Sequence, residues 1–540
     1  MQKLLGKRLC LAGGIFILLL LLLQSCTYEQ LIGWISEHYA LSHTQSQKLQ
    51  ELFPAWRWHA VRFVVASCPA LLYLLLPRVW QNSLLLIKET NFELKSILFF
   101  YQQNTTARYT LAVTSLGIGI WYAFQTARFP LPHIDEAFGY VHLIRRGVLV
   151  CMSYYPGPNH HVLYYLLAAC FDKLLPAFWA IKLPTLLATV ALHALLMDTA
   201  LRKLRLPAAT ATLLAVGFHS IEGLAVYATL GRGYLLQCFW LMLALRTLPA
   251  LEASALARRL FLIAQGMAFY TLPTHLYAYF ALAVACGWSY GFQKRWVWGL
   301  HLQILCLTAL LYLPFVLTQG VFFWQSPFIA SVSHTEWLRL FPNYLWSVLL
   351  FLFKNAFITI LWLSIGMIYM ITLSFKVISL KEEDCAALCL IGIPWAMAAL
   401  QGFMPPTRVW LFLALPFWWM LARLSTYKWQ LCLLYALLAL WLQLHNAWTF
   451  RKSWANYFAL HEAIAAIPAE TRCIETRDDW VYTTLLYQKH TKQMPAQVAY
   501  PPQQAPCPTP ALCLMPRDKS TIDGSRLVYA NAYFAVYEKN

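Results

Sequence analysis

Two adjacent carboxylates, Asp135 and Glu136, lie in the stretch 130–140, directly after an apolar run that ends near Thr126. A carboxylate within hydrogen-bond reach of a hydroxyl group can take its proton, so both acids are candidate general bases. Apolar surroundings penalise ionisable groups, and those retained within or beside a membrane helix are expected to mark a site. We therefore take Asp135 and Glu136 as the candidate catalytic pair.

Helical spacing adds basic groups to this pair. A helix that begins at Asp135 presents on one face Asp135, Gly139, His142 and Arg146. The neighbouring face presents Glu136 and Tyr140, and His133 stands just before the helix. Such a surface can hold a hydroxyl group and a phosphate together. The alternative is that Asp135 only caps the helix after Pro132, a common role of aspartate.

A second polar segment, Tyr154–His161, follows a short distance along the chain. Its two prolines favour an extended backbone, and Asn159, His160 and His161 can donate to a phosphate or orient an acceptor group. Two histidines near two acids can also hold a divalent cation. Neighbouring side chains in a helix point in different directions, so the sequence leaves both alternatives open.

Two arginines stand at the mouths of later apolar runs. Arg232 lies between two glycines and close to Tyr234, and Arg408 follows a pair of prolines. Glycine lets a ligand approach the backbone, and arginine is suited to two-pronged phosphate binding. The alternative for each arginine is that its side chain reaches from the bilayer to the lipid head groups.

The composition indicates an integral membrane protein. Of 540 residues, 60% are hydrophobic and 12% are charged, against about 25% charged residues in soluble domains. The net charge is +18, but the basic residues form short clusters between apolar runs, as at the cytoplasmic ends of membrane helices. No extended basic stripe occurs, so we expect no nucleic-acid partner and favour the lipid bilayer and phosphate ligands.

Apolar runs recur along the chain, and we expect a mainly α, polytopic membrane protein with about 11–13 spans. The runs cover 9–23, 60–77, 109–127, 177–198, 207–222, 233–249, 260–290, 297–318, 350–375, 385–402, 409–424 and 429–447. The start, Met1–Ser25, is interpreted as an uncleaved first span. The run 260–290 is long enough for two short spans around Pro273, where we favour helix packing over ligand binding. The short run 161–175 is expected to be re-entrant or to lie along the outer surface.

Basic clusters such as Arg202–Arg205 are interpreted as cytoplasmic. This places the Asp-Glu stretch, the Tyr227–Tyr234 turn, the loop 319–345 and the segment 404–408 together on the outer side. We divide the chain into an N-terminal membrane segment with two spans, 1–108, a membrane domain that carries the site, 109–450, and a C-terminal domain, 451–540.

The polar tail 451–540 is predicted to form a small α/β domain on the outer side. An amphipathic pattern predicts a helix at Trp454–Ile467, and alternating patterns predict strands at Arg472–Thr476, Leu512–Met515 and Arg526–Tyr537. Cys473, Cys507 and Cys513 lie in this tail. If the tail is exported, one disulfide can form and one cysteine is left over.

Together these motifs resemble the GT-C membrane glycosyltransferases, and among them the protein-O-mannosyltransferase and lipid A aminoarabinose-transferase group. The resemblance covers residues 109–450 and rests on the Asp-Glu loop, the Pro/Asn/His-rich turn, the Arg-Gly-Tyr turn at 232–234 and the Pro-Pro-x-Arg at 405–408. Two features depart from the family. Two apolar runs precede the span before the Asp-Glu loop, where the family usually has one, and Asn159-His160-His161 replaces a basic motif.

The resemblance implies inverting transfer of a hexosyl or pentosyl group from a polyprenyl-phosphate donor to a glycan, lipid or protein acceptor. In this interpretation Asp135 is the base, Glu136 orients the acceptor or a cation, and Arg232, Arg408 and His161 bind phosphate. No cofactor is required, although a divalent cation is an open alternative. The implied location is a bacterial inner membrane, with the site and the C-terminal domain on the periplasmic or exterior side.

Two other classes of function compete with this interpretation. A lipid or glycan transporter of flippase type should carry its charges near the bilayer midplane and show broken helices or repeats. The sequence instead places the charged cluster at the outer boundary of the membrane. A membrane scaffold whose C-terminal domain does the work predicts that Asp135 is dispensable.

Overall fold

The structure is a computed structural model. It describes residues 95–155, 160–319, 332–354, 356–375, 380–427, 454–468, 471–476, 478–491, 497–499, 511–516, 525–530 and 532–539, with isolated positions elsewhere. Four predictions therefore lie wholly or largely outside the described residues: the first span, the run 60–77, Asn159 and the run 429–447.

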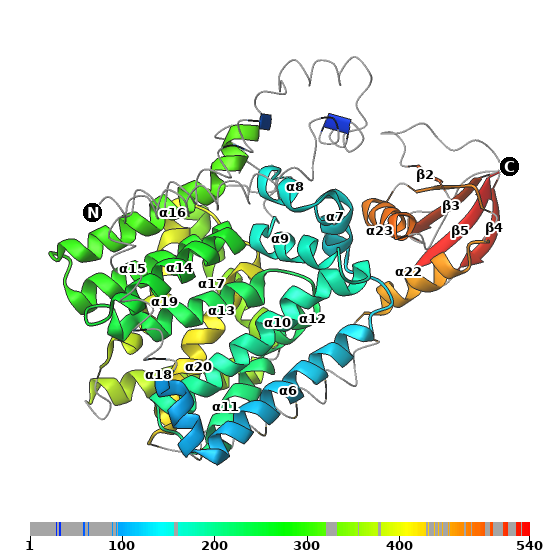
Figure 1. The fold of residues 1–540 in the computed structure, drawn as a ribbon. Helices are drawn as coiled ribbons and strands as arrows, with labels where there is room; N and C mark the ends of the chain where they lie inside the picture. Colours follow the sequence, from blue (N-terminus) through cyan, green and yellow to red (C-terminus); the bar gives the residue numbers. More distant parts are fainter. Residues whose placement is uncertain are drawn as a thin grey trace.

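Most of the described chain is a bundle of apolar helices (Figure 1). Its helices are α6 (Thr105–Ala127), α10 (Ala177–Asp198), α11 (Ala208–His219), α12 (Glu222–Thr229), α13 (Tyr234–Thr247), α14 (Ala255–Thr271), α15 (Leu276–Tyr290), α16 (Arg295–Gln319), α17 (His334–Phe353), α18 (Ala356–Ser374), α19 (Glu382–Gln401) and α20 (Ala414–Ser425). Short helical turns join them: η3 (Thr199–Lys203), η4 (Leu248–Ala250), η5 (Pro273–His275) and η6 (Thr407–Leu413). The protein is thus a mainly α, polytopic membrane protein, as the sequence predicts.

Three helices in the described part of the chain are long and apolar enough to cross a membrane: Ala177–Lys203, Arg295–Gln319 and Glu382–Gln401. Two bent pairs raise this to five if each pair counts as one span. In one of them α11 and α12 meet at 72°. The higher predicted number of spans includes runs outside the described residues and stays a prediction.

Proline and serine explain where several helices break or begin. The run 260–290 forms two helices, α14 and α15, because Pro273 lacks the backbone N–H that a continuous helix needs. The predicted outer loop 319–345 is wrong in its second half, where α17 begins at His334. The side chain of Ser333 accepts a hydrogen bond from the backbone N–H of Glu336, and this cap starts the helix inside the expected loop.

Four short helices form the segment between α6 and α10: α7 (Ile134–His142), η2 (Ile144–Arg146), α8 (Val148–Ser153) and α9 (Val162–Phe171). With ten residues, α9 is far shorter than the roughly 20 residues that cross a bilayer, which agrees with the prediction that 161–175 does not span it alone. Helix α7 ends at His142, so the predicted face that runs on to Arg146 is wrong. Arg146 belongs to the separate turn η2.

Ion pairs hold the end of α10 that is remote from α7. Asp198 pairs with Arg202 at 3.3 Å and also with Arg246, and Lys203 pairs with Glu383 at the start of α19. These basic residues belong to or neighbour the predicted cytoplasmic cluster. In the folded protein they join three helices, because charges buried among apolar helices need partners.

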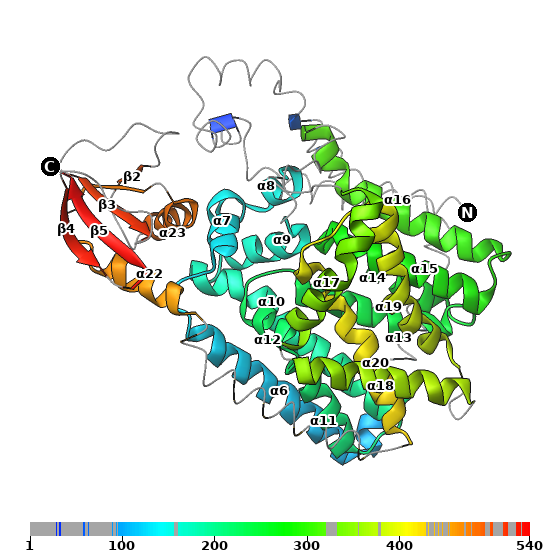
Figure 2. The same ribbon diagram turned by 180° about the vertical axis from the view of Figure 1, so that it is seen from behind.

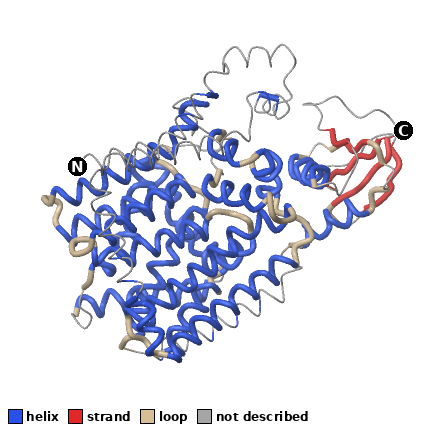
Figure 3. Tube along the Cα trace, viewed as in Figure 1, coloured by secondary structure: helices blue, strands red, loops and turns tan. Residues whose placement is uncertain are grey.

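The C-terminal domain is a small α/β unit beside the bundle (Figure 3). Its sheet has the strand order β2-β1-β3-β5-β4. The strands are β1 (Cys473–Glu475), β2 (Gln497–Ala499), β3 (Ala511–Pro516), β4 (Ser525–Ala530) and β5 (Phe534–Lys539), and the helices are α22 (Ala455–Ala465) and α23 (Asp479–His490). The predicted helix and the predicted strands around Cys473 and Leu512 are confirmed, and the stretch Arg526–Tyr537 forms parts of two strands, β4 and β5. Helix α23 and strand β2 were not predicted.

Two cysteines of the C-terminal domain, Cys473 and Cys513, lie within the described residues. Cys473 is disulfide-bonded, and Cys513 is buried. A disulfide is typical of a domain in an oxidising compartment.

Both views of the ribbon place the C-terminal domain next to α7 (Figures 1 and 2). The segment just before α7 takes part in the core of this domain. Leu131 is 1% exposed and packs in one apolar cluster with Leu460 of α22 and Leu485 of α23. The chain that leads to the two acids is therefore anchored outside the helical bundle.

Replacing Leu131 with alanine should loosen this anchor. Removal of a buried leucine side chain typically costs about 2–5 kcal/mol, here at the junction between the C-terminal domain and α7. We expect faster proteolysis within 451–540 and a lower melting temperature in detergent. Leu174→Ala, at a leucine that is 79% exposed, is the matched control and should change neither. Equal behaviour of the two variants would contradict the anchoring role.

Candidate active site

The start of α7 fixes where the two acids point. The backbone N–H of His133 donates to Glu136 Oε2 at 2.6 Å, and the backbone N–H of Asp135 donates to His133 Nδ1 at 3.3 Å. His133, not Asp135, is thus the N-cap, and the alternative that Asp135 only caps the helix is wrong. Asp135 does not cap the helix, because His133 and Glu136 form the capping box. Its side chain keeps 31% of its surface exposed.

The carboxylate of Asp135 forms an ion pair with Nη1 of Arg232. Arg232 stands in the turn between α12 and α13 and is 1% exposed. Thr185 of α10 holds this turn: its hydroxyl donates to Arg232 O at 3.0 Å and accepts from Arg232 N at 3.2 Å. The predicted acid and the predicted phosphate ligand therefore come together from distant parts of the sequence.

Arg232 also binds His161, at the start of α9. Its Nε–H donates to His161 Nε2 over 3.1 Å, and the imidazole is fully buried. Burial, helped by the charge of Arg232, holds the pKa of His161 well below its usual range. The ring is therefore neutral, and because Nε2 accepts, its hydrogen is on Nδ1.

Arg232 and His161 each carry one buried N–H group that has no hydrogen-bond partner among the described residues. The two atoms are Arg232 Nη2 and His161 Nδ1. Buried donors are rarely left unsatisfied, so these two N–H groups are suited to bind an acceptor such as an anion. The backbone here is tightly confined: a Cβ on Gly233 would lie 2.8 Å from Thr271 Cγ2 and 3.0 Å from His161 Nδ1.

Electrostatics keep Asp135 ionised. Burial alone would raise the pKa of its carboxyl, but the charges of Arg232, His133 and Arg408 and the hydrogen bond from Arg232 outweigh it. The pKa of Asp135 therefore lies below its ordinary value. Arg408, in η6, also acts on the imidazole of His161, so the second predicted arginine lies near the same cluster.

Glu136 occupies a different environment, because it is fully buried. Its carboxylate accepts from Lys182 Nζ at 2.6 and 2.8 Å and from the backbone N–H of Gly231. Lys182 in turn donates to Thr229 O at 2.9 Å. The pair ties α7 to α10 and to the turn that carries Arg232. Sequence analysis missed Lys182, although a single lysine within the apolar run 177–198 was a signal.

The remaining predicted residues spread around this core. Tyr234 lies beside His161, with ring centroids 4.9 Å apart. His160 packs among aromatic rings instead and bonds Cys151 O at 3.0 Å through Nε2. Burial lowers the pKa of His160 to about 3, so it too is neutral.

Tyr140 and His142 turn toward other neighbours. The ring of Tyr140 meets that of Tyr487 in α23, at 5.4 Å between centroids. Burial, together with the charge of Asp172, raises the pKa of Tyr140 to about 12. His142 packs on Phe138 at 4.5 Å. No contact between these side chains and Asp135 is recorded among the described residues.

Within the described part of the chain, no group of three or more His, Cys, Asp or Glu side chains is arranged to hold a metal ion. His133 Nδ1 lies 3.8 Å from Asp135 Oδ2, but that nitrogen already accepts from the backbone N–H of Asp135. Binding of a divalent cation stays a prediction.

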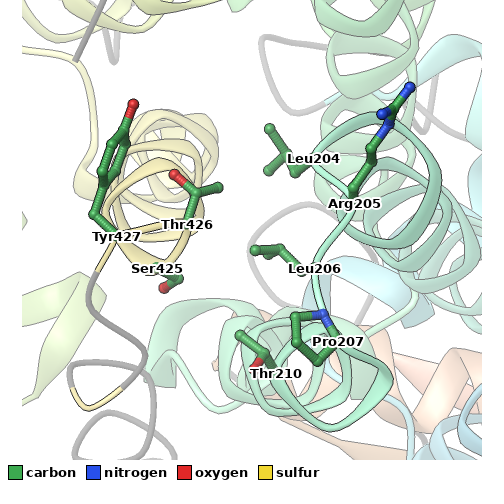
Figure 4. Close-up of a pocket in the computed structure, with 8 residues that line it drawn as sticks. All are labelled: Leu204, Arg205, Leu206, Pro207, Thr210, Ser425, Thr426 and Tyr427. Carbon is green, nitrogen blue, oxygen red and sulfur yellow. The ribbon is translucent and has the colours of Figure 1, made fainter.

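A cavity of about 430 Å³ lies at the other end of α10 (Figure 4). Residues 204–207 and Thr210 line one side, and residues 425–427 line the other. It contains no carboxylate, and Arg205 is its one charged side chain. This cavity is separate from the cluster around Asp135.

Comparisons with known proteins find similarity to solved structures of one protein. No protein-family model matches the sequence, and no curated protein matches it. Two crystal structures of ArnT from Cupriavidus metallidurans are similar. The form bound to undecaprenyl phosphate has 13% sequence identity and a TM-score of 0.40, and covers 79% of this chain and 97% of its own. The apo form has 13% identity and a TM-score of 0.41, and covers 81% of this chain and 98% of its own.

Glu136→Gln should destabilise the protein, because it leaves the charge of Lys182 buried without its partner. Breaking a buried ion pair from one side typically costs about 3–5 kcal/mol. The double variant Glu136→Gln with Lys182→Met should recover most of the lost melting temperature. If Glu136 acts only as this anchor, the double variant should also keep the activity of the protein. A stable but inactive double variant would instead show that Glu136 contacts the substrate.

Proposed function

We propose that this protein is a glycosyltransferase that moves a sugar from a polyprenyl-phosphate donor to an acceptor on the outer face of the membrane. One observation carries the proposal: an accessible carboxylate, Asp135, lies against a buried arginine with an unsatisfied N–H group. A base and an anion ligand side by side are what this reaction needs. The apolar helices around them supply a surface that suits a polyprenyl chain.

The proposed step is a single displacement. Asp135 takes the proton of the acceptor hydroxyl, and the acceptor oxygen bonds to the anomeric carbon of the sugar. The bond between that carbon and the phosphate oxygen breaks on the opposite side, so the configuration inverts. The electron pair leaves with polyprenyl phosphate. Phosphate is already a good leaving group, and no cofactor is required in this scheme.

Arg232 and His161 are suited to receive the phosphate. Both offer a buried N–H that lacks a partner within the described residues, and Arg408 adds positive charge nearby. Fixed donors in a water-poor site stabilise developing charge more than they do in water. A phosphate that binds Arg232 also offsets the charge that depresses the basicity of Asp135. Donor binding would then prepare the base for the acceptor.

The sidedness of the proposal rests on two features. The disulfide at Cys473 fits an oxidising compartment, and the C-terminal domain that contains it packs beside α7. The basic cluster Arg202–Arg205 lies at the other end of α10. We therefore propose a periplasmic or exterior site in an inner membrane. The sugar, hexosyl or pentosyl, and the acceptor, whether glycan, lipid or protein, are left to the donor panel below.

A lipid or glycan transporter is the second candidate. The 72° break between α11 and α12, which is separated from Arg232 by the short helix α12, favours it, because transporters bind substrates at interrupted helices. Transport moves an intact substrate across the bilayer, whereas transfer breaks its sugar–phosphate bond. Product analysis in sealed vesicles separates the two.

Asp135→Asn should abolish transfer, because an amide cannot accept the proton. Loss of a general base typically lowers the rate about 10²- to 10⁴-fold. The measurement is release of polyprenyl phosphate and labelling of acceptor in reconstituted vesicles, with a panel of radiolabelled polyprenyl-phosphate sugars. Glu252→Gln is the control, since Glu252 pairs with Lys294 at the surface, and it should behave as wild type. A folded Asp135→Asn protein with full activity would refute the base assignment.

The pH dependence follows from the lowered pKa of Asp135. The ionised base persists at neutral pH and is lost only as the pH falls through that lowered pKa. Transfer by the wild type should therefore show no loss from the titration of Asp135 between about pH 7 and pH 5. Arg232→Gln removes the main charge that lowers the pKa of Asp135, so burial of the carboxyl then dominates. The loss of activity at low pH should therefore begin at a higher pH in this variant. The comparison uses kcat/KM at limiting donor, which reports the free enzyme, and a loss of activity at the same low pH in both proteins would contradict the pairing.

A further inference from the structure

The C-terminal domain touches the proposed catalytic helix at its first turn. The ring of Tyr457, in α22, stacks on His133 with 5.4 Å between centroids and 27° between ring planes. The backbone of Ile134 lies near the hydroxyl group of Tyr457. Tyr457 is 6% exposed, so these contacts are shielded from water. One tyrosine therefore holds two consecutive residues directly before Asp135.

His133 connects this tyrosine to the base. Its Nδ1 accepts from the backbone N–H of Asp135, so the orientation of the imidazole and the position of Asp135 depend on each other. Trp454 fixes the other side of the contact, with its ring edge-on to both His133, at 6.4 Å, and Phe129, at 4.9 Å. The imidazole of His133 therefore packs among aromatic side chains of the C-terminal domain.

A second contact lies at the far end of α7. Tyr140 and Tyr487 meet edge to face, and Tyr487 belongs to α23. From the bundle side, Lys182 and Arg232 hold the two acids by their carboxylates. The helix is thus fixed from the bundle by charge and from the C-terminal domain by aromatic packing.

We propose that the C-terminal domain positions the catalytic helix, and that Tyr457 is the positioning residue through which it acts on Asp135. This inference rests on the proposed function only for its effect on rate. Tyr457 does not contact the reacting atoms in this scheme. It fixes His133 and Ile134, and these in turn fix the direction of the carboxylate toward the acceptor.

The test compares Tyr457→Phe and Tyr457→Leu in the full-length protein. Tyr457→Phe removes the hydroxyl group near Ile134 and keeps the stacking on His133, whereas Tyr457→Leu removes both. Tyr533→Phe is the control, at a tyrosine that is 46% exposed in the turn between β4 and β5. Hydrogen exchange of the amides of residues 133–142 reports the position of α7 without any assay of activity. Steady-state transfer is measured in parallel.

We expect faster exchange across 133–137 in both Tyr457 variants, greater in Tyr457→Leu, with α10 amides unchanged. A misplaced catalytic group typically costs about tenfold to a hundredfold in rate, so kcat should fall by that factor while KM for the donor stays constant. The Tyr533→Phe protein should match wild type in both measurements.

Two results separate failure of this inference from failure of the proposed function. Unchanged exchange in folded Tyr457→Leu overturns the positioning role, whatever the activity. If exchange is faster in the Tyr457 variants but the wild-type protein transfers no sugar, the positioning role is supported and the glycosyltransferase function is refuted. Loss of donor affinity instead of kcat would place Tyr457 in the binding site and also overturn the inference.

Discussion

The ion pair between Asp135 and Arg232 is the interaction on which the rest of the site depends. A guanidinium as deeply buried as that of Arg232 is stable only with a counter-charge, and Asp135 supplies it. The same contact brings α7 against the turn between α12 and α13. It also lowers the pKa of the Asp135 carboxyl, which keeps this group ionised. The arrival of an anion at Arg232 would change that balance.

The two adjacent acids have diverged in role because their environments differ. Asp135 is partly exposed and faces Arg232, whereas Glu136 is sealed with Lys182 and caps the helix through its contact with His133. Two neighbouring side chains on a helix point about 100° apart, which is enough to separate an open surface from a closed core. The buried pair supplies rigidity, and the open acid is available for chemistry.

Much of the fold was predictable from the sequence because hydrophobicity is a local property. The run 177–198 became α10 with the same limits, and Pro273 split the run 260–290 into two helices. The strands around Cys473 and Leu512 also followed from alternation. The cap at Ser333 and the early end of α7 at His142 were missed, because a single hydrogen bond or a single turn decides them.

The sequence by itself determined that this is a helical membrane protein with polar groups gathered beside Asp135. Long apolar runs with few charges are a property of the sequence alone, whatever the packing of the helices. The sequence also predicted Arg232, Arg408 and His161 as phosphate ligands, though only as separate motifs. The tertiary structure decided that Arg232 joins Asp135 to His161, that Lys182 seals Glu136, and that Tyr457 supports His133. These contacts join residues far apart in the chain, and only the packing of whole helices sets which side chains meet.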